Sequence, residues 1–186
     1  APVGNIINCS YKLLSQVKPD AMLVLGDTNS CLSVIPAKRL HIPIFHMEAG
    51  NRCFDECLPE ETNRRIVDII SDVNMCYSEH ARRYLNASGV AKERTYVTGS
   101  PMAEGLHQNL AEIEASDVHA RLGLEKGKYI LLSAHREENI DTEKNFKSLF
   151  TAINAMAEKY DMPILYSCHP RSRKRLGQSG FKLDGR

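Results

Sequence analysis

The stretch PIFHMEAGNR at residues 43–52 changes from apolar to polar within a few residues, and this change indicates the fold. Its first half is a short apolar run of the type found in β-strands. Its second half places Glu48 and Arg52 directly after that run. In an open α/β sheet, ligands bind beyond the carboxyl ends of the strands, so both side chains are expected at a ligand site.

A second apolar run, AMLVL at residues 21–25, predicts another strand of the same kind. It is apolar throughout, as expected for a parallel strand that is covered on both faces. Gly26 permits a tight turn after this strand, and the polar side chains at 28–30 can cap a following helix. Asp27 is therefore expected at the carboxyl edge of the sheet.

Three carboxylates thus follow neighbouring segments: Asp27, Glu48 and Glu60, the last of them in the PEETNR stretch at 59–64. Crowded carboxylates push each other's proton affinities apart, which suits acid/base chemistry. Glu60 and Arg64 are four residues apart and share a helix face, so Arg64 also suits a simple ion pair with Glu60. Singly, Asp27 suits a helix cap and Glu60 suits any helix N-terminus. Together, the three favour a functional site.

Helices and strands alternate along the chain, which predicts an α/β fold with a parallel sheet and helices on both faces. The expected helices are 4–17, 29–40, 60–71, 79–87, 101–114, 142–160 and one from 171, and the expected strands are 21–25, 43–47, 73–77, 95–98, 129–133 and 163–167. In helix 60–71, the isoleucines at 66, 69 and 70 make the predicted buried stripe.

Two sets of these units are separated by a polar, helical stretch. We expect residues 1–110 to be part of one α/β domain, 111–127 to be a connector and 128–186 to begin a second domain. The chain opens in a helix with no preceding strand and ends soon after a basic helix, so both domains are expected to be incomplete.

Composition excludes some classes of function. Lysine and arginine total 24 against 23 aspartate and glutamate, which argues against bulk attraction to nucleic acid or to anionic membranes. No apolar run approaches a membrane span, and the first residues do not resemble a signal peptide. We expect a cytoplasmic protein whose cysteines are all reduced and bind no metal: Cys9, Cys31, Cys53, Cys57, Cys76 and Cys168.

A second polar cluster follows the predicted strand 129–133, where His135 and Arg136 suit phosphate binding because both side chains donate hydrogen bonds. A similar arrangement recurs at His169, where a turn followed by a solvated basic helix is an equally good explanation. No Gly-x-Gly-x-x-Gly follows a strand and no P-loop is present, so neither nucleotide motif is indicated.

Five segments together resemble the UDP-N-acetylglucosamine 2-epimerase family: LGDT at 25–28, HMEAGNR at 46–52, PEETNR at 59–64, TGSP at 98–101 and HREEN at 135–139. They occur in the family's order with compatible spacing. The resemblance implies two Rossmann-like domains of GT-B type, both incomplete here, with the nucleotide sugar between them. It also implies a complete chain roughly twice as long, a homodimer, and a reaction that needs no metal or redox cofactor.

By this resemblance, the acid/base candidates are Asp27, Glu48 and Glu60, and His135 assists the leaving phosphate. The remaining candidates are Arg52, Arg64 and Arg136 for substrate or structural contacts, and Glu138 and His169 for binding a second, activating UDP-sugar.

The NRCFDECL segment at 51–58 is similar to the branch that acts on UDP-2-acetamido-2,6-dideoxy-L-talose. That branch yields UDP-N-acetyl-L-fucosamine for bacterial capsule and O-antigen, and Cys53 or Phe54 could suit the methyl group of the sugar. The alternatives are a UDP-N-acetylglucosamine/UDP-N-acetylmannosamine 2-epimerase and an inactive, truncated UDP-sugar-binding fragment.

Two other enzyme classes compete with an epimerase. A metal-dependent phosphoesterase could draw ligands from Asp27, His46, His135 and His169, but the chain lacks an Asp-x-His start and an Asn-His pair after a strand. A retaining glycosyltransferase shares the two-domain build, although the Glu-Ala-Gly and Pro-Glu-Glu segments favour the epimerase.

Overall fold

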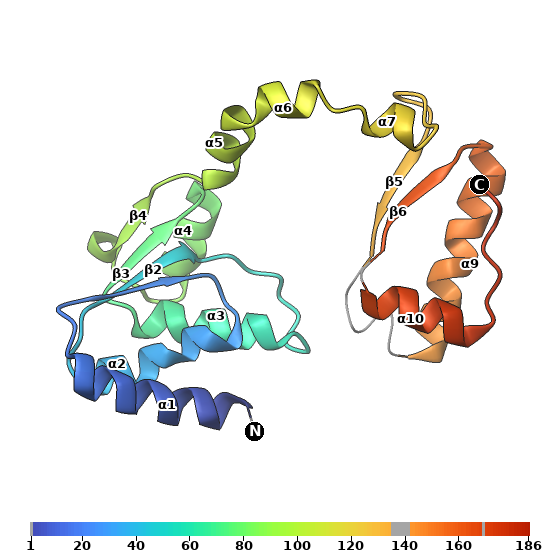
Figure 1. Ribbon diagram of the computed structural model, residues 1–186. Coiled ribbons are helices and arrows are strands. Elements are labelled where there is room, and N and C mark those ends of the chain that lie inside the picture. Colours follow the sequence, from blue (N-terminus) through green and yellow to red (C-terminus); the bar gives the residue numbers. More distant parts are fainter. Residues whose placement is uncertain (1, 135–141, 169) are drawn as a thin grey trace. The chain divides into compact units, whose positions relative to one another are not determined.

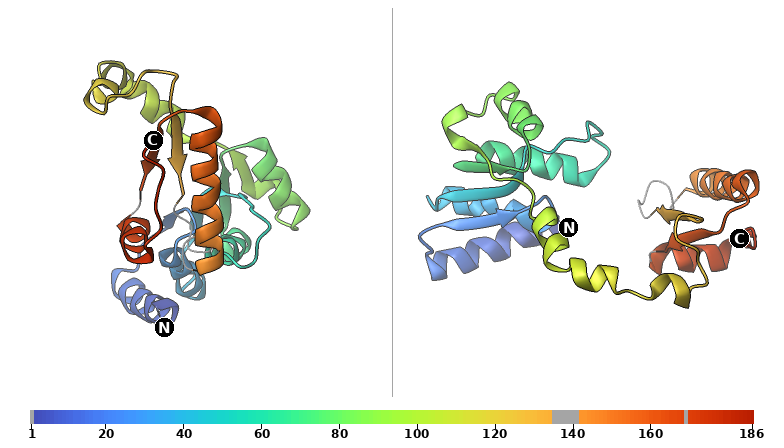
Figure 2. Two further views of the ribbon diagram at one scale, coloured as in Figure 1. Left: turned by 90° about the vertical axis from the view of Figure 1, so that its right-hand side faces the viewer. Right: turned by 90° about the horizontal axis from the view of Figure 1, so that it is seen from above.

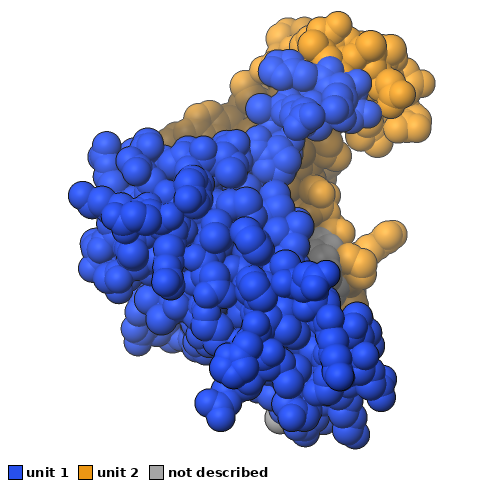
Figure 3. All heavy atoms as spheres, turned by 90° about the vertical axis from the view of Figure 1, so that its left-hand side faces the viewer, with its two compact units in different colours: residues 1–109 blue, residues 110–186 orange. Residues whose placement is uncertain are grey.

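Two separate sets of parallel strands organise the chain (Figure 1). The computed structural model describes residues 2–134, 142–168 and 170–186. The chain divides into two compact units, residues 1–109 and 110–186, which are coloured separately in Figure 3. Each unit has its own hydrophobic core.

The first unit is a parallel sheet in which the described strands follow the order β1-β2-β3-β4. Its elements are α1 (Pro2–Val17), β1 (Met22–Leu25), the 3-10 turn η1 (Asn29–Ser33), α2 (Val34–Arg39), β2 (Ile44–Ala49), α3 (Pro59–Ile70), β3 (Val73–Cys76), α4 (Glu79–Ala87), the 3-10 turn η2 (Lys92–Arg94), β4 (Thr95–Val97) and α5 (Pro101–Gln108). The predicted helix 29–40 thus begins as a 3-10 turn, and the predicted helix 101–114 breaks at Asn109.

One face of this sheet packs against the helices. Val24, His46 and Asn74 lie side by side on neighbouring strands, and all three are buried on this face. The alternate residues of β1, Leu23 and Leu25, point the other way and are 65% and 61% exposed. The expectations that strand 21–25 is covered on both faces, and that helices flank both sides of the sheet, are therefore wrong for the described residues.

The one-sided cover follows from the strand order. Parallel strands are joined by right-handed crossovers in nearly all known folds. Because each new strand here is added on the same side of the previous one, every right-handed connection returns across the same face of the sheet. The polar contact between Asn74 of β3 and the backbone of α3, and the packing of Cys76 against α4, place both helices on that face.

The carboxyl end of β2 lies in close contact with α4. Gly50 has a φ of +80°, and a Cβ at this position would lie 2.4 Å from the carbonyl oxygen of Ala81. The neighbouring Ala49 is fully buried in a cluster with Cys76 and Leu85. Only glycine permits this approach, so the path of the chain after β2 is fixed at residue 50.

The second unit pairs two parallel strands against two long helices (Figures 1 and 2). Its elements are α6 (Leu110–Glu114), α7 (Val118–Arg121), β5 (Ile130–Ser133), α9 (Glu143–Tyr160), β6 (Ile164–Ser167) and α10 (Pro170–Ser179). Phe146 and Phe150 of α9 form its core with Tyr166 of β6 and Leu176 of α10. No helix in the described parts of either unit is long and apolar enough to cross a membrane.

Gly50→Ala is expected to destabilise the protein by at least about 2 kcal/mol, because an added Cβ meets both a left-handed backbone and the Ala81 carbonyl. Gly89→Ala is the matched control, since Gly89 has a φ of +90° but nothing lies within 4 Å of an added Cβ. Urea unfolding of both variants measures the difference. Equal losses of unfolding free energy in the two variants would show that the close approach of Gly50 to α4 adds nothing to the cost of the left-handed backbone.

Candidate active site

Glu48 lies in a bulge at the carboxyl end of β2. Met47 pairs with Met75 and Ala49 pairs with Cys76 on β3, so Glu48 is an extra residue on its strand, and its φ is +66°. A bulge re-aims a side chain, and bulges are common next to active sites. The predicted strand 43–47 therefore continues through Glu48 instead of ending before it.

The Glu48 carboxylate faces the turn that follows β1. Its Oε1 accepts a hydrogen bond from Asn51 Nδ2 at 3.3 Å. Its Oε2 lies 3.3 Å from where a Cβ of residue 26 would be, so the absence of a side chain at Gly26 leaves room for it. Asp27 is the next residue, and the structure thus brings the Glu48 side chain beside the segment that carries Asp27.

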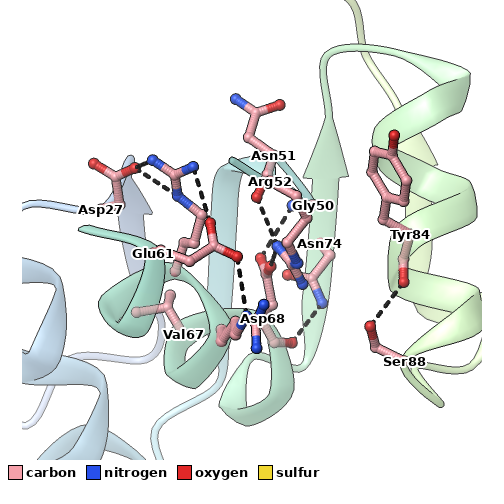
Figure 4. Close-up of polar contacts among 12 residues, drawn as sticks. Asp27, Gly50, Asn51, Arg52, Glu61, Val67, Asp68, Asn74, Tyr84 and Ser88 are labelled. Carbon is pink, nitrogen blue, oxygen red and sulfur yellow. Dashed lines mark hydrogen bonds and ion pairs between the residues drawn. The ribbon is translucent and has the colours of Figure 1, made fainter. Parts of the chain in front are cut away.

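A buried carboxylate, Asp68 in the last turn of α3, contacts the same strand end from below (Figure 4). Its Oδ1 accepts from the Gly50 backbone N–H at 3.2 Å and lies 3.0 Å from His46 Nδ1, off the axis of a well-directed hydrogen bond. Its Oδ2 accepts from Arg52 Nη1 at 2.6 Å. His46 Nε2 donates in turn to the carbonyl of Gly26 at 3.1 Å, which ties β2 to the end of β1.

Asp27 is ion-paired with Arg64 of α3 (Figure 4). Both Nε, at 2.9 Å, and Nη2 of Arg64 donate to Asp27 Oδ2. Arg64 Nη1 also donates to Glu61 Oε2 at 3.3 Å, and Asn63 Nδ2 donates to the Asp27 carbonyl at 2.9 Å. Burial opposes the charge of Arg64, but the bonds from its guanidinium to Asp27 outweigh this and raise the pKa of Arg64.

Glu61, and not Glu60, is the carboxylate that α3 buries. Glu61 accepts from the Cys53 backbone N–H at 3.1 Å and from Arg65 Nε at 3.0 Å. Glu60 is exposed in the first turn of the helix. The predicted ion pair between Glu60 and Arg64 is therefore wrong, because one residue along a helix rotates the side chain by about 100° and brings Glu61 to the inner face.

The inner face of α3 differs from the predicted isoleucine stripe in the same way. Ile69 is 58% exposed, while Ile66 and Ile70 are partly buried against the core. The fully buried positions include the charged residues Glu61 and Asp68. A carboxylate within the apolar run RIVDII was the signal in the sequence that could have indicated a buried charge at Asp68.

The structure gives two of the predicted arginines structural contacts. Arg52 has only 5% of its side chain exposed and holds Asp68, and Arg64 holds Asp27 and Glu61. Contact of either arginine with a substrate stays a prediction. The other predicted binding or catalytic residues, His135, Arg136, Glu138 and His169, lie outside the described residues.

The described residues include all six cysteines and several possible metal ligands. All six cysteines are free thiols, and Cys31 and Cys76 are buried. Burial raises the pKa of both thiols to about 11. Among the described residues, no three or more His, Cys, Asp or Glu side chains are grouped to hold a metal ion. Two of the ligands considered for a phosphoesterase are engaged elsewhere: Asp27 by Arg64 and His46 by Gly26 and Asp68.

Comparison with known proteins identifies the family. The model of the family described as UDP-N-acetylglucosamine 2-epimerase matches residues 1–184. The chain belongs to the UDP-N-acetylglucosamine 2-epimerase family. A family member from Methanococcus maripaludis, named UDP-N-acetylglucosamine 2-epimerase, is 36% identical over 182 residues, which is 96% of this chain and 50% of that protein.

Solved structures agree with the family assignment. A UDP-N-acetylglucosamine 2-epimerase structure from Rickettsia bellii matches with a TM-score of 0.86 and 47% identity, over 97% of this chain and 47% of that one. The Methanocaldococcus jannaschii enzyme in complex with UDP-GlcNAc and UDP matches with a TM-score of 0.84 and 35% identity, over 95% of this chain and 49% of that one. The chain thus spans about half the length of these family members.

Glu61→Gln is expected to reduce the free energy of unfolding by about 2 kcal/mol at neutral pH. The substitution removes the negative charge that accepts hydrogen bonds from Arg64 and Arg65 in a buried site. Burial acts to raise the pKa of Glu61, but the hydrogen bonds from the Cys53 N–H and Arg65 outweigh it and lower the pKa. The stabilisation is therefore present above the unfolded pKa of about 4.3 and is lost as the pH falls through the folded value.

Urea unfolding between about pH 7 and about pH 3, the range in which carboxylates titrate, tests this expectation. The difference between the native protein and Glu61→Gln should shrink as the solution is acidified. Glu60→Gln is the control, with an expected loss below about 1 kcal/mol because Glu60 is exposed. A gap for Glu61→Gln that is independent of pH would contradict the assignment of its charge.

Proposed function

We propose that the protein to which this chain belongs interconverts UDP-N-acetylglucosamine and UDP-N-acetylmannosamine, without net hydrolysis, by inverting C2 of the sugar. The observation that carries the proposal is the Glu48 carboxylate in its bulge beside the Asp27 turn. Family membership and the names of the relatives support the same substrate. They favour it over the talose sugar that the 51–58 segment suggested.

The chemistry requires the anomeric bond to break. The C2 hydrogen of an N-acetylamino sugar is only weakly acidic. Departure of UDP, with the electron pair of the C1–O bond, leaves an oxocarbenium-like C1 that acidifies C2. A carboxylate removes the C2 proton, and the C2–H electron pair forms the C1=C2 double bond of a glycal. A proton then adds to the opposite face of C2 while a diphosphate oxygen of UDP bonds again to C1.

Proton removal on one face and delivery on the other call for more than one acid/base group. We assign these roles to Asp27, Glu48 and Glu60. Asp27 lies in an ion pair with Arg64 at the end of β1. His135 is proposed to assist the leaving phosphate, where donors stabilise the developing negative charge.

Further roles rest on the family resemblance. Arg52, Arg64 and Arg136 are proposed to contact the substrate or to support groups that do. Glu138 and His169 are proposed to bind a second UDP-sugar as an activator, which predicts initial rates that are not hyperbolic in substrate. A homodimer of the full-length protein is proposed on the same ground.

A second candidate substrate is UDP-2-acetamido-2,6-dideoxy-L-talose, which the NRCFDECL segment favours. Phe54 of this segment is exposed and stacks edge-on against Tyr84 of α4, with 5.5 Å between the ring centroids. An apolar side chain in this loop could accept the methyl group of a 6-deoxy sugar. The activity test therefore offers both kinds of sugar.

Proton NMR of the full-length protein in D2O tests the reaction itself. With UDP-N-acetylglucosamine, deuterium should enter C2 as the manno epimer forms. A parallel sample with UDP-N-acetyl-L-fucosamine should exchange more slowly. Faster exchange of the fucosamine sugar would assign the talose branch, and absence of C2 exchange in both samples would refute the epimerase.

Glu48→Gln is expected to reduce turnover by about 10²–10⁴-fold, because a general acid or base contributes that much and an amide cannot exchange the proton. Circular dichroism and thermal unfolding should match the native protein. Glu79→Gln is the control, because it removes only an exposed α4 carboxylate that pairs with Arg82. Native turnover in Glu48→Gln would remove Glu48 from the mechanism.

A further inference from the structure

The backbone at Glu48 needs an external restraint. A residue with a side chain pays about 1–2 kcal/mol in the left-handed region that Glu48 occupies, with its φ of +66°. Such conformations persist only where the surrounding structure fixes them. The groups that hold the flanking residues therefore determine where the Glu48 carboxylate points.

Those flanking groups converge on one side chain. His46 and Gly50 lie two residues before and two residues after Glu48, and both approach the same oxygen, Asp68 Oδ1, at 3.0 and 3.2 Å. Arg52, two residues further on, donates to Asp68 Oδ2 at 2.6 Å. One carboxylate of α3 thus holds the chain on both sides of the bulge.

The carboxylate at the centre of this arrangement is closed to solvent. Asp68 is fully buried, and only 5% of the Arg52 side chain is exposed. If the Asp68 charge is removed, the donors of Gly50 and Arg52 lose their buried anionic acceptor, and an unsatisfied donor in such a site is costly. The bulge would then relax toward an ordinary strand, and Glu48 would turn with it, because a shift of one residue reverses the face to which a strand side chain points.

We propose that Asp68 is a positioning residue of the epimerase, which holds the left-handed bulge that aims the Glu48 carboxylate at the substrate. The proposal rests on the proposed function of the site, and it assigns Asp68 no contact with the sugar. Asp68 acts through His46, Gly50 and Arg52 on the residue between them.

Asp72, in the loop between α3 and β3, provides a control at the other end of β2, although 35% of its side chain is exposed whereas Asp68 is buried. Its Oδ2 accepts from the Ile44 backbone N–H at 3.0 Å, and its Oδ1 is 2.5 Å from Lys38 Nζ. Asp72 therefore ties the amino end of β2 in the way that Asp68 ties the carboxyl end. Loss of this contact therefore removes an ionic tie on β2 without removing a contact to the residues that flank Glu48.

Asp68→Asn and Asp72→Asn in the full-length protein separate the two roles. An asparagine at 68 can still accept from Gly50, but its amide N–H groups face the donors of Arg52. We expect Asp68→Asn to lower kcat by about 100-fold with little change in KM, as for a misplaced catalytic group, and Asp72→Asn to leave kcat within about twofold. Native kcat in folded Asp68→Asn, or equal losses in both variants, would overturn the proposal.

Asp68→Glu covers the case in which Asp68→Asn does not fold. It keeps the charge but moves the carboxylate by one methylene, so we expect a kcat between those of the native protein and Glu48→Gln. Native kcat in this variant would contradict a positioning role that depends on the contact distances.

A crystal structure tests the proposal without measuring the reaction. A crystal structure of full-length Asp68→Asn, or of Asp68→Glu, should show Glu48 outside the left-handed region or its carboxylate turned away from Gly26. If this change occurs but the native protein exchanges no C2 proton, the proposed function fails and the restraint on the bulge stands. If the bulge is unchanged, the role of Asp68 is refuted whatever the activity.

Discussion

The buried carboxylate of Asp68 is the interaction on which the candidate site depends. It joins α3 to the carboxyl end of β2 through a backbone N–H, an imidazole and a guanidinium. Charges removed from water are retained only when they are paired and hydrogen-bonded, and loss of one partner leaves the others uncompensated. The position of Glu48 is therefore coupled to the packing of α3 against β2.

A second network begins on the same helix. Glu61, Arg64 and Asp68 are spaced three and four residues apart, which places them along one face of α3. Arg64 reaches the end of β1 through Asp27, and Asp68 reaches the end of β2 through Arg52 (Figure 4). His46 joins the two strands through its hydrogen bond to the Gly26 carbonyl. The charged stripe of α3 thus sets the spacing between two of the three proposed acid/base groups.

Apolar runs and their polar ends were sufficient to predict the parallel strands and the edge at which Asp27 and Glu48 lie. Local pattern could not predict the bulge at Glu48, because the extra residue is defined only by pairing with Met75 and Cys76 on β3. The local pattern also did not show that carboxylates of α3 point inward. A buried charge can be predicted only when its partner is known, and the partner of Asp68, Arg52, is distant in sequence. The open face of the sheet at Leu23 depends on strand order, which a pattern within one strand does not contain.

A crystal structure of the full-length protein with UDP-N-acetylglucosamine bound tests the site and the mechanism together. C2 of the sugar should lie within about 3.5 Å of a carboxylate oxygen of Glu48, Asp27 or Glu60, the separation at which a proton can be transferred. Glu48 should keep its left-handed backbone over Asp68 in that complex. A sugar whose C2 faces none of these carboxylates would contradict both the site and the mechanism.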